Sequence, residues 1–294
     1  MNKQKQFSEH MFDFFVYGVA ILLILVILYP LWFVIIASFS NPADVANGNV
    51  WLLPKEWKLE GYQKLFEQPL FWRGYFNTIL YTLLGTAVAL FVNIPAGYAL
   101  SRKDLFGRKW VSIFIIVPMF ISGGLIPTYL VVKQVGLVNT FWVMVVPFAV
   151  SSYNIIVART FFNNNIPDGL WEAAQIDGCS TVRYFFSIVI PLSKAILAVI
   201  GLWTAVGIWN SWFNALIYLT DENLQPLQLI LRRLLINNQM LQSQATGELA
   251  SELRATADMM KYAAIVVSTA PIMMLYPFLQ KYFNKGVMIG AIKE

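Results

Sequence analysis

The sequence has 294 residues, of which 58% are hydrophobic and only 13% are charged, and its formal net charge is +5. A soluble globular chain carries roughly 25% charged residues, so this composition predicts a protein that is embedded in a membrane. The basic residues lie at the edges of apolar runs and do not gather on a polar domain, which argues against nucleic acid as a partner.

The first apolar run extends from Phe14 to Phe39 and follows Lys3 and Lys5, as the core of a signal peptide would. It is much longer than the roughly 7 to 15 residues of such a core. About 20 apolar residues cross the hydrocarbon as a helix, and a helix satisfies its own backbone hydrogen bonds there. The sequence therefore predicts a retained membrane anchor.

Five further apolar runs follow, and each qualifies or nearly qualifies as a membrane span. We predict an all-α, polytopic membrane protein with six transmembrane helices in a single domain, residues 1–294. Its transport core is expected at about 76–283, and residues 1–75 are expected to form the first span and an external segment. The six predicted spans cover approximately Phe12 to Phe39, Phe76 to Leu100, Trp110 to Val132, Thr140 to Val157, Ala195 to Leu219, and Tyr262 to Leu279.

The distribution of charge sets the expected orientation. With the N-terminus in the cytoplasm, the inside segments hold twelve Lys/Arg and seven Asp/Glu, while the outside segments hold nine of each. Basic residues in short loops fix orientation most reliably, and one short loop contains Arg102, Lys103, Arg108 and Lys109. Both termini and the loop between the fourth and fifth spans are therefore expected in the cytoplasm.

Two long segments are then expected outside, from Asn41 to Tyr75 and from Thr220 to Lys261. The second contains an amphipathic run, Leu229 to Ile236, and we interpret it as an ordered external lobe. The alternative is a solvated connector, although loops of this length are uncommon unless they are functional or disordered. Prolines interrupt five of the six spans, which fits a translocation pathway but is also common in ordinary membrane helices.

We call the loop between the fourth and fifth spans, residues 166–191, the connecting segment. Pro167 suits the first turn of a helix, where its missing N–H costs nothing, and Gly178 suits the left-handed position that ends one. We therefore predict a short helix from Pro167 to Asp177. A second short segment, Thr181 to Ile190, leads to Pro191, where we expect the chain to bend into the fifth span.

The side chains of this predicted helix favour a docking role. Ala173 and Ala174 are small, so the helix can sit deep in a partner's groove. Trp171 is of a type that is enriched at the centres of interfaces. The alternative is a surface-lying helix that only joins two spans.

The spacing of Glu172-Ala173-Ala174, Gly178, Ile188 and Pro191 resembles the cytoplasmic coupling loop of bacterial ABC-importer permeases. One departure is Ile190, where the family pattern has Leu. The resemblance covers nearly the whole chain and is closest to the permeases of carbohydrate-uptake importers, the family of the maltose permease's smaller subunit, in its complex-oligosaccharide subgroup. Other stretches that show the resemblance are Gly61 to Phe66, Arg73 to Thr78, Ala99 to Arg102, and Tyr282 to Ala291.

The resemblance implies a type I importer permease fold with a cytoplasmic coupling helix, in a bacterial inner membrane. It also implies a second, similar permease subunit, two ATPase subunits and an extracellular substrate-binding protein. ATP and Mg²⁺ would bind the ATPases, because the chain has no Gly-x-x-x-x-Gly-Lys-Ser/Thr phosphate loop and is expected to hold no cofactor or metal. The residues that the resemblance assigns to coupling are Leu170, Trp171, Glu172, Ala173, Ala174, Asp177, Gly178, Ile188 and Pro191.

Sugar binding would need aromatic faces together with amides or hydroxyls. In a continuous fifth span, Trp209 and Trp212 share one helix face, as do Asn210 and Asn214. Tyr153 and Asn154 in the fourth span are further candidates. The alternative for the aromatic residues is a membrane-interface belt, and the alternative for the amides is a bond to the partner permease.

Other classes of function are less well supported. A permease for another small solute remains open, and an ion-coupled secondary carrier would need ionisable groups in its spans, where Asp13 and Lys194 lie only near the ends. For a membrane enzyme, the sole histidine, His10, precedes the first span, and no residue cluster has metal-ligand spacing. Cys179 is the only cysteine, so an internal disulfide cannot form. We expect Cys179 to be a small packing residue.

Overall fold

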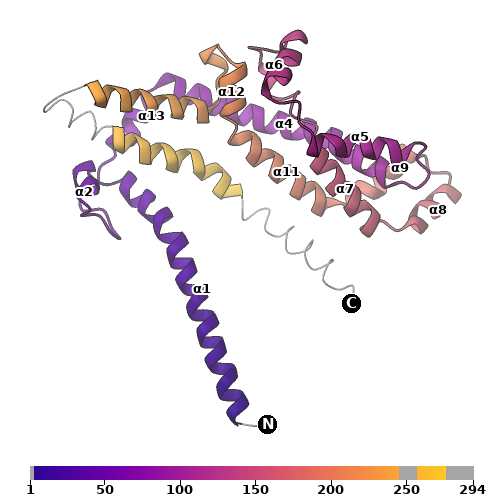
Figure 1. The fold of residues 1–294 in the computed structure, drawn as a ribbon, viewed down its shortest axis with the longest axis horizontal. Coiled ribbons are helices and arrows are strands. Elements are labelled where there is room, and N and C mark those ends of the chain that lie inside the picture. The colour runs from indigo at the N-terminus through magenta and orange to yellow at the C-terminus, as the bar shows by residue number, and fades with distance from the viewer. Residues whose placement is uncertain (1–2, 245–256, 276–294) are drawn as a thin grey trace. The chain divides into compact units, whose positions relative to one another are not determined.

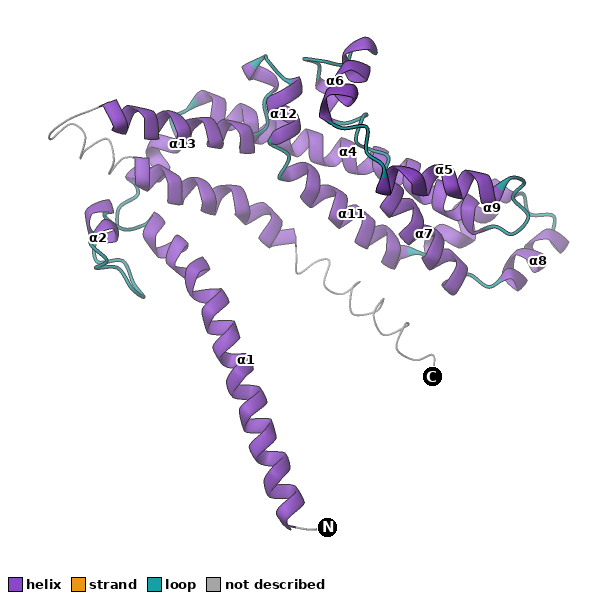
Figure 2. Cartoon of the chain, viewed as in Figure 1, coloured by secondary structure: helices purple, strands orange, loops and turns teal. Residues whose placement is uncertain are grey.

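The computed structural model describes residues 3–244 and 257–275, and within them the chain is built from helices and loops (Figures 1 and 2). This confirms the all-α prediction. The predicted similarity of the tail, Tyr282 to Ala291, lies outside the described residues. The elements are α1 (Lys3–Ser38), α2 (Pro42–Ala46), α3 (Glu60–Phe66), α4 (Pro69–Ser101), α5 (Arg108–Phe120), α6 (Leu125–Gln134), η1 (Phe141–Met144), α7 (Ser152–Asn165), α8 (Asp168–Ile176), α9 (Thr181–Tyr184), η2 (Phe185–Val189), α10 (Ile190–Leu192), α11 (Lys194–Trp209), α12 (Phe213–Tyr218), η3 (Glu222–Leu224), α13 (Leu227–Gln244) and a last helix, Ala257–Leu275.

Within the described residues, three helices are long and apolar enough to cross a membrane: Met11–Ser38, Pro69–Ser101 and Ala257–Leu275. They correspond to the first, second and sixth predicted spans. Two bent pairs would raise the number to five, namely α5 with α6, bent by 120°, and the helical stretch Thr181–Leu192 with α11, bent by 80°. The described residues therefore contain three to five candidate spans by length and composition, and the sixth crossing stays a prediction.

The fourth predicted span, Thr140 to Val157, is not a continuous helix. Its first half is a short 3-10 turn followed by non-helical backbone, and α7 begins only at Ser152. The reason lies in α4, where the side chain of Asn93 is fully buried. It donates to the carbonyl of Ala149 at 2.7 Å and accepts from the N–H of Ser151 at 2.9 Å. Irregular backbone is tolerated at membrane depth when the protein satisfies its polar groups in this way.

The fifth predicted span, Ala195 to Leu219, is also interrupted. Helix α11 ends at Trp209, and α12 starts afresh at Phe213. At the break, the side-chain amide of Asn210 donates to the carbonyl of Val206 at 2.9 Å. Such local side-chain bonds compete with continuation of a helix, which explains why an apolar run of this length does not form one rod.

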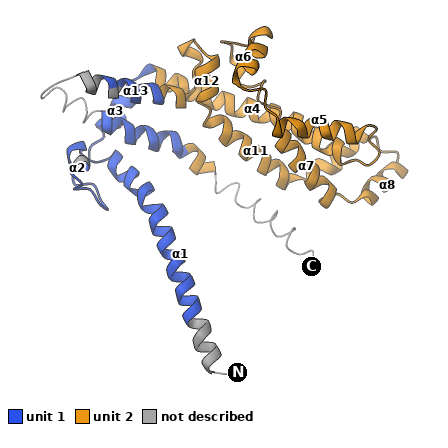
Figure 3. Ribbon diagram, viewed as in Figure 1, with its two compact units in different colours: residues 1–69, 231–270 blue, residues 70–230, 271–294 orange. Residues whose placement is uncertain are grey.

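The chain divides into two compact units, residues 1–69 with 231–270 and residues 70–230 with 271–294 (Figure 3). In the first unit, Tyr62 of α3 anchors the end of α1: its hydroxyl lies 2.8 Å from that of Ser38, and its ring stacks on Phe39 with centroids 5.2 Å apart. Gly61 packs directly against the backbone of Met259, where an added Cβ would lie 2.7 Å from the carbonyl oxygen. The prediction of one domain stays a prediction.

The second unit is organised around α4, whose glycines allow close approach by three other elements. An added Cβ would lie 2.3 Å from Ile230 at Gly74, 2.6 Å from Ile208 at Gly85, and 2.5 Å from Ala158 at Gly97. Small residues at such contacts let membrane helices approach closely and gain packing energy. Helix α4 thus contacts the start of α13, the middle of α11 and the middle of α7.

The start of the segment expected to be an external lobe is ordered and bonded to α4. The Asn77 amide donates to the carbonyl of Asn223 at 2.7 Å, and the Tyr81 hydroxyl donates to that of Leu224 at 2.7 Å. The hydroxyl of Thr78 accepts from the N–H of Leu227 at 2.8 Å, at the first residue of α13. The amphipathic run Leu229 to Ile236 lies in this helix, as expected of an ordered segment.

Candidate functional site

Helix α8 of the connecting segment ends where the sequence predicts. Gly178 has φ +69°, and its N–H donates to the carbonyl of Gln175 at 3.0 Å. The next N–H, that of Cys179, reaches back to the carbonyl of Ala174 at 2.8 Å. This pair of bonds forms a Schellman motif, which satisfies the last carbonyls of a helix and favours glycine at the left-handed position. The chain direction after α8 is therefore fixed by local backbone geometry.

The beginning of α8 is tied to the loop that follows α4. Lys103 Nζ lies 2.7 Å from a carboxylate oxygen of Asp168, in the first turn of α8. Hydrogen bonding and charge from Lys103 hold the pKa of Asp168 below its usual value. Because this pKa is lowered, the contact is complete at neutral pH and weakens only as pH falls below the ordinary Asp value of about 4. A carboxylate at this position also complements the helix dipole.

The inner face of α8 packs against its own chain. Ala174 is buried, and the ring of Trp171 meets that of Tyr184 edge-on, with centroids 5.0 Å apart at 67°. The guanidinium carbon of Arg102 lies over the ring of Trp171, 4.7 Å from the ring centroid. Trp171 is thus partly covered by Tyr184 and Arg102 of its own chain, and its contact with a docked partner stays a prediction.

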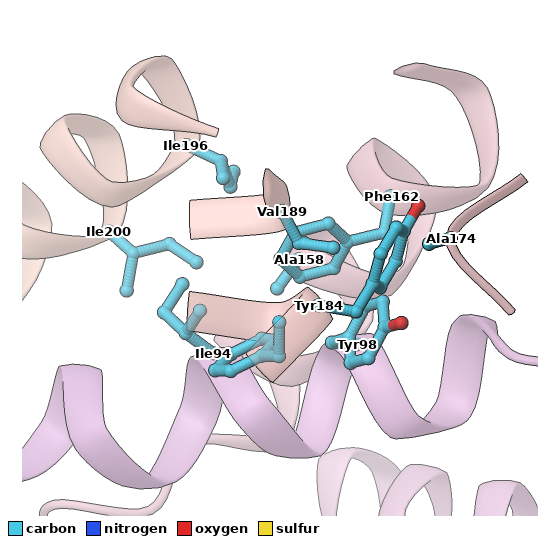
Figure 4. Close-up of a cluster of buried hydrophobic side chains, with 10 residues drawn as sticks. Ile94, Tyr98, Ala158, Phe162, Ala174, Tyr184, Val189, Ile196 and Ile200 are labelled. Atoms are coloured by element: carbon cyan, nitrogen blue, oxygen red, sulfur yellow. The ribbon is translucent and has the colours of Figure 1, made fainter. Parts of the chain in front are cut away.

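The connecting segment is held by a hydrophobic cluster that we call the basal core (Figure 4). Six elements contribute to it, namely α4, α7, α8, α9, η2 and α11. Ile188 packs at its edge. The basal core therefore joins the connecting segment to α4, α7 and α11. Its members are Ile94 and Tyr98 of α4, Ala158 and Phe162 of α7, Ala174, Tyr184, Phe185 and Val189 of the connecting segment, and Ile196 and Ile200 of α11.

The outer face of the connecting segment carries exposed apolar side chains among charged ones. Ile176 is 87% exposed and Leu170 is 40% exposed. Val182 and Phe186, on the following helical turns, are exposed as well. Of the other residues that the sequence assigned to coupling, Glu172, Ala173, Asp177 and Pro191 are exposed. Apolar groups gathered on an otherwise polar segment are typical of a surface that binds a partner.

The predicted elbow lies close to Pro191 but not at it. The helix changes to a π-helical turn, η2, just before the proline, and the 80° bend falls at Ser193, between α10 and α11. Proline cannot donate to the preceding turn, and π-turns and prolines are established causes of helix irregularity. The connecting segment therefore enters α11 through a sharp, packed corner.

A second candidate site is a cavity of about 200 Å³ between α7, η1 and α11. It brings together two of the six residues predicted for the substrate pathway, Asn154 and Asn214. The amide of Asn154 is 9% exposed and lies 3.5 Å from the hydroxyl of Thr204. The lining combines amides, hydroxyls and apolar side chains without a charged group, and consists of Met144, Phe148, Asn154, Thr204, Gly207, Ile208, Ser211 and Asn214.

The other four predicted pathway residues do not line this cavity. Trp209 is buried edge-on against Tyr75, with centroids 5.8 Å apart, and Trp212 packs on Phe213. Asn210 bonds within its own helix, and the half-exposed Tyr153 packs against Trp203. The shared helix faces predicted for the two Trp and the two Asn are wrong, because α11 ends at Trp209 and α12 begins only at Phe213.

Sequence reasoning missed Thr204, Gly207 and Ile208 of α11 and Ser211, which follows the end of that helix. Gly207 and Ile208 lie three and four residues after Thr204, so these three share one face of α11, and that spacing was a readable signal. Among the residues that the structure describes, no group of three His, Cys, Asp or Glu side chains is placed to hold a metal ion.

Comparison with known proteins places these features in a family. Residues 89–289 match the family described as binding-protein-dependent transport system inner membrane component. The chain is 37% identical over 286 residues to the polygalacturonan/rhamnogalacturonan transport system permease protein YtcP of Bacillus subtilis (strain 168), covering 97% of this chain and 99% of that one. It is 39% identical over 264 residues to protein LplC of the same organism, covering 90% and 88%.

A solved structure is also similar. The crystal structure of a bacterial ABC transporter involved in the import of the acidic polysaccharide alginate contains a chain that matches with a TM-score of 0.85 and 32% sequence identity. The match covers 94% of the present chain and 98% of the solved one. The helical arrangement that carries the connecting segment and the cavity is thus shared with that importer.

Proposed function

From the premise that the chain belongs to the family of binding-protein-dependent transport system inner membrane components, we propose that it carries an oligosaccharide across a bacterial inner membrane. The chain is a membrane permease subunit of an ABC importer. The cavity supports a sugar as cargo, because its amides and hydroxyls match the hydroxyls of a carbohydrate and its apolar side chains match the C–H faces. A permease for another small solute is the alternative.

The observation that carries the proposal is the two-faced connecting segment. Ala174 of α8 is fixed in the basal core, and Ile176, on the opposite side of that helix, is exposed. We propose that the exposed face lies in the cytoplasm and docks into a cleft of a separate ATPase subunit, which binds ATP and Mg²⁺. Movement of that subunit would then reach α4, α7 and α11 through the basal core.

The complete transporter in this proposal holds two ATPase subunits, a second permease subunit similar to this one, and a substrate-binding protein outside the membrane. The binding protein delivers the sugar, and this chain contributes no catalysis and no cofactor of its own. The names of the relatives support the class of cargo, since YtcP is a polygalacturonan/rhamnogalacturonan transport system permease and the solved structure is a transporter involved in the import of alginate.

An ion-coupled carrier has little support in the described residues. The charged residue within α7 is Arg159, which is half-buried and lies 3.4 Å from the hydroxyl of Ser112 in α5. This bond ties two helices together, whereas ion relays are built from carboxylates and histidines along a pathway.

The test of docking is a bulky residue at Gly178. An added Cβ at this position meets nothing within 4 Å, so the side chain of Gly178→Val would project into open space in the isolated chain. The left-handed φ costs roughly 1–2 kcal/mol for such a residue. In the complete transporter the valine would collide with the ATPase cleft. We expect sugar uptake by cells to fall at least tenfold while the amount of the chain in the membrane stays normal.

Gly136→Val is the matched control, because Gly136 has φ +78° and equally open surroundings but lies outside the connecting segment. It carries the same backbone strain and should leave uptake within twofold of normal. Gly178→Asn separates strain from bulk, since asparagine tolerates the left-handed region; it should still reduce uptake. Normal uptake by both Gly178 variants would refute docking at this loop.

A further inference from the structure

The loop that follows α4 makes a second, polar connection to the connecting segment, in addition to the basal core. Arg102 is its centre. The guanidinium donates through Nε and a terminal nitrogen to the two carboxylate oxygens of Asp104, at 3.0 and 3.1 Å. With its plane held in this way, it lies 4.7 Å from the ring centroid of Trp171 in α8.

The contact between Arg102 and Trp171 connects the end of α4 to α8. Helix α4 ends at Ser101, so Arg102 is the first residue beyond it, and Trp171 lies in the middle of α8. Trp171 in turn meets Tyr184 of α9, which belongs to the basal core. A movement of α8 is therefore transmitted to the end of α4 by the contact between the Arg102 guanidinium and the Trp171 ring, as well as by the apolar packing of the basal core.

Two contacts link the same elements, and they differ in exposure. The side chains of Lys103 and Asp168 are 79% and 61% exposed, so water and salt screen their attraction. The Arg102 side chain is only 19% exposed and lies against an aromatic face, where a cation is attracted with less competition from water. Arg102 and Trp171 therefore form the stronger link.

We propose that Arg102 and Trp171 are positioning residues which make α4 move together with α8 when the ATPase moves the connecting segment. The proposal rests on the proposed function, and it adds a direct polar route to the end of α4 beside the apolar route through the basal core. Arg102 does not touch ATP or sugar in this scheme. Its loss leaves docking intact but lets ATP hydrolysis proceed without the full movement of the permease.

The experiment measures ATP hydrolysed per sugar transported, with the complete transporter and its binding protein in proteoliposomes. We expect Arg102→Ala and Trp171→Leu each to raise this ratio at least threefold. The double variant should be no worse than the worse single one, because both changes remove the same contact. Trp171→Phe keeps an aromatic face for the cation and should lie within twofold of normal, which also shows that the fold tolerates substitution there.

Arg108→Ala is the matched control. It removes an equal charge from the same loop, but Arg108 Nε bonds the carbonyl of Leu100 at 2.8 Å and belongs to no contact with α8 in the part of the chain that is described. In the Arg108→Ala variant, the number of ATP molecules hydrolysed per sugar transported should be normal. An unchanged ratio in both Arg102→Ala and Trp171→Leu, with uptake and hydrolysis lowered in proportion, would overturn the proposal, as would a double variant whose effect is the product of the two singles.

The Gly178→Val variant in the same liposomes separates this inference from the proposed function. If Gly178→Val blocks transport while Arg102→Ala keeps a normal ratio, docking stands and the positioning role of Arg102 fails. If Gly178→Val transports normally, docking itself fails, and the positioning role falls with it.

Discussion

Gly207 keeps one wall of the cavity open. It lies within α11, and an added Cβ would meet nothing within 4 Å, so the space beside it belongs to the cavity that Asn154 and Asn214 line. A glycine inside a helix costs up to about 1 kcal/mol relative to alanine, and this one makes no close helix contact in return. A glycine at position 207 is therefore best explained by the open space of the cavity, which a side chain would fill.

Filling this space should block the cargo without harming the fold. We expect Gly207→Leu to lower the initial rate of sugar uptake at least tenfold, because a leucine side chain would occupy much of the 200 Å³. The midpoint of thermal unfolding of the purified chain should stay the same or rise. Gly18→Leu on α1 is the control, since Gly18 is also helical and has open surroundings. Normal uptake by Gly207→Leu would remove the cavity from the pathway.

The non-helical stretch between η1 and α7 depends on one side chain from another element. Asn93 of α4 bonds the carbonyl of the buried Ala149 and the N–H of the partly buried Ser151. An unsatisfied buried polar group costs about 1–3 kcal/mol. We therefore expect Asn93→Leu to lower the free energy of unfolding of the detergent-solubilised chain by about 2–4 kcal/mol.

Denaturant unfolding of the purified variant measures this loss. Asn165→Leu is the comparison, because the amide of Asn165 bonds only the carbonyl of Phe161 in its own helix, and that change should cost less than about 1 kcal/mol. Equal losses in the two variants would mean that Asn93 does not hold the irregular stretch.

These elements also show how far the sequence could predict the fold. The end of α8 was predictable, because Gly178 and its left-handed backbone are a local matter. The break in the fourth span was not, since hydropathy counts apolar residues and cannot detect that Asn93, more than fifty residues away, satisfies a non-helical backbone. The break in the fifth span goes with a local bond of Asn210, which hydropathy does not take into account either. The direction of Trp171 likewise depends on Arg102 and Tyr184, which the local sequence does not bring near it.

At the scale of the whole molecule, the irregular fourth segment decides where the connecting segment lies. Between the segment after α1, which is predicted to lie outside, and the connecting segment, the chain passes α4, the bent pair α5 and α6, and the stretch from η1 to α7. The three predicted crossings would place the two segments on opposite sides of the membrane. If the stretch from η1 to α7 did not cross, both would lie on the same side and no cytoplasmic ATPase could reach α8.

Cysteine labelling distinguishes these two topologies, and the single native cysteine makes it simple. In a Cys179→Ser background, Leu53→Cys and Ile176→Cys place a thiol at positions that are 70% and 87% exposed. With a membrane-impermeant maleimide and right-side-out vesicles, we expect Leu53→Cys to react at once and Ile176→Cys to react only after permeabilisation. Reaction of both from outside would show that the membrane is crossed an even number of times between them. The loop Arg102 to Lys109, which follows the single crossing by α4, would still face inward, but the connecting segment would lie outside and its docking to a cytoplasmic ATPase would be excluded.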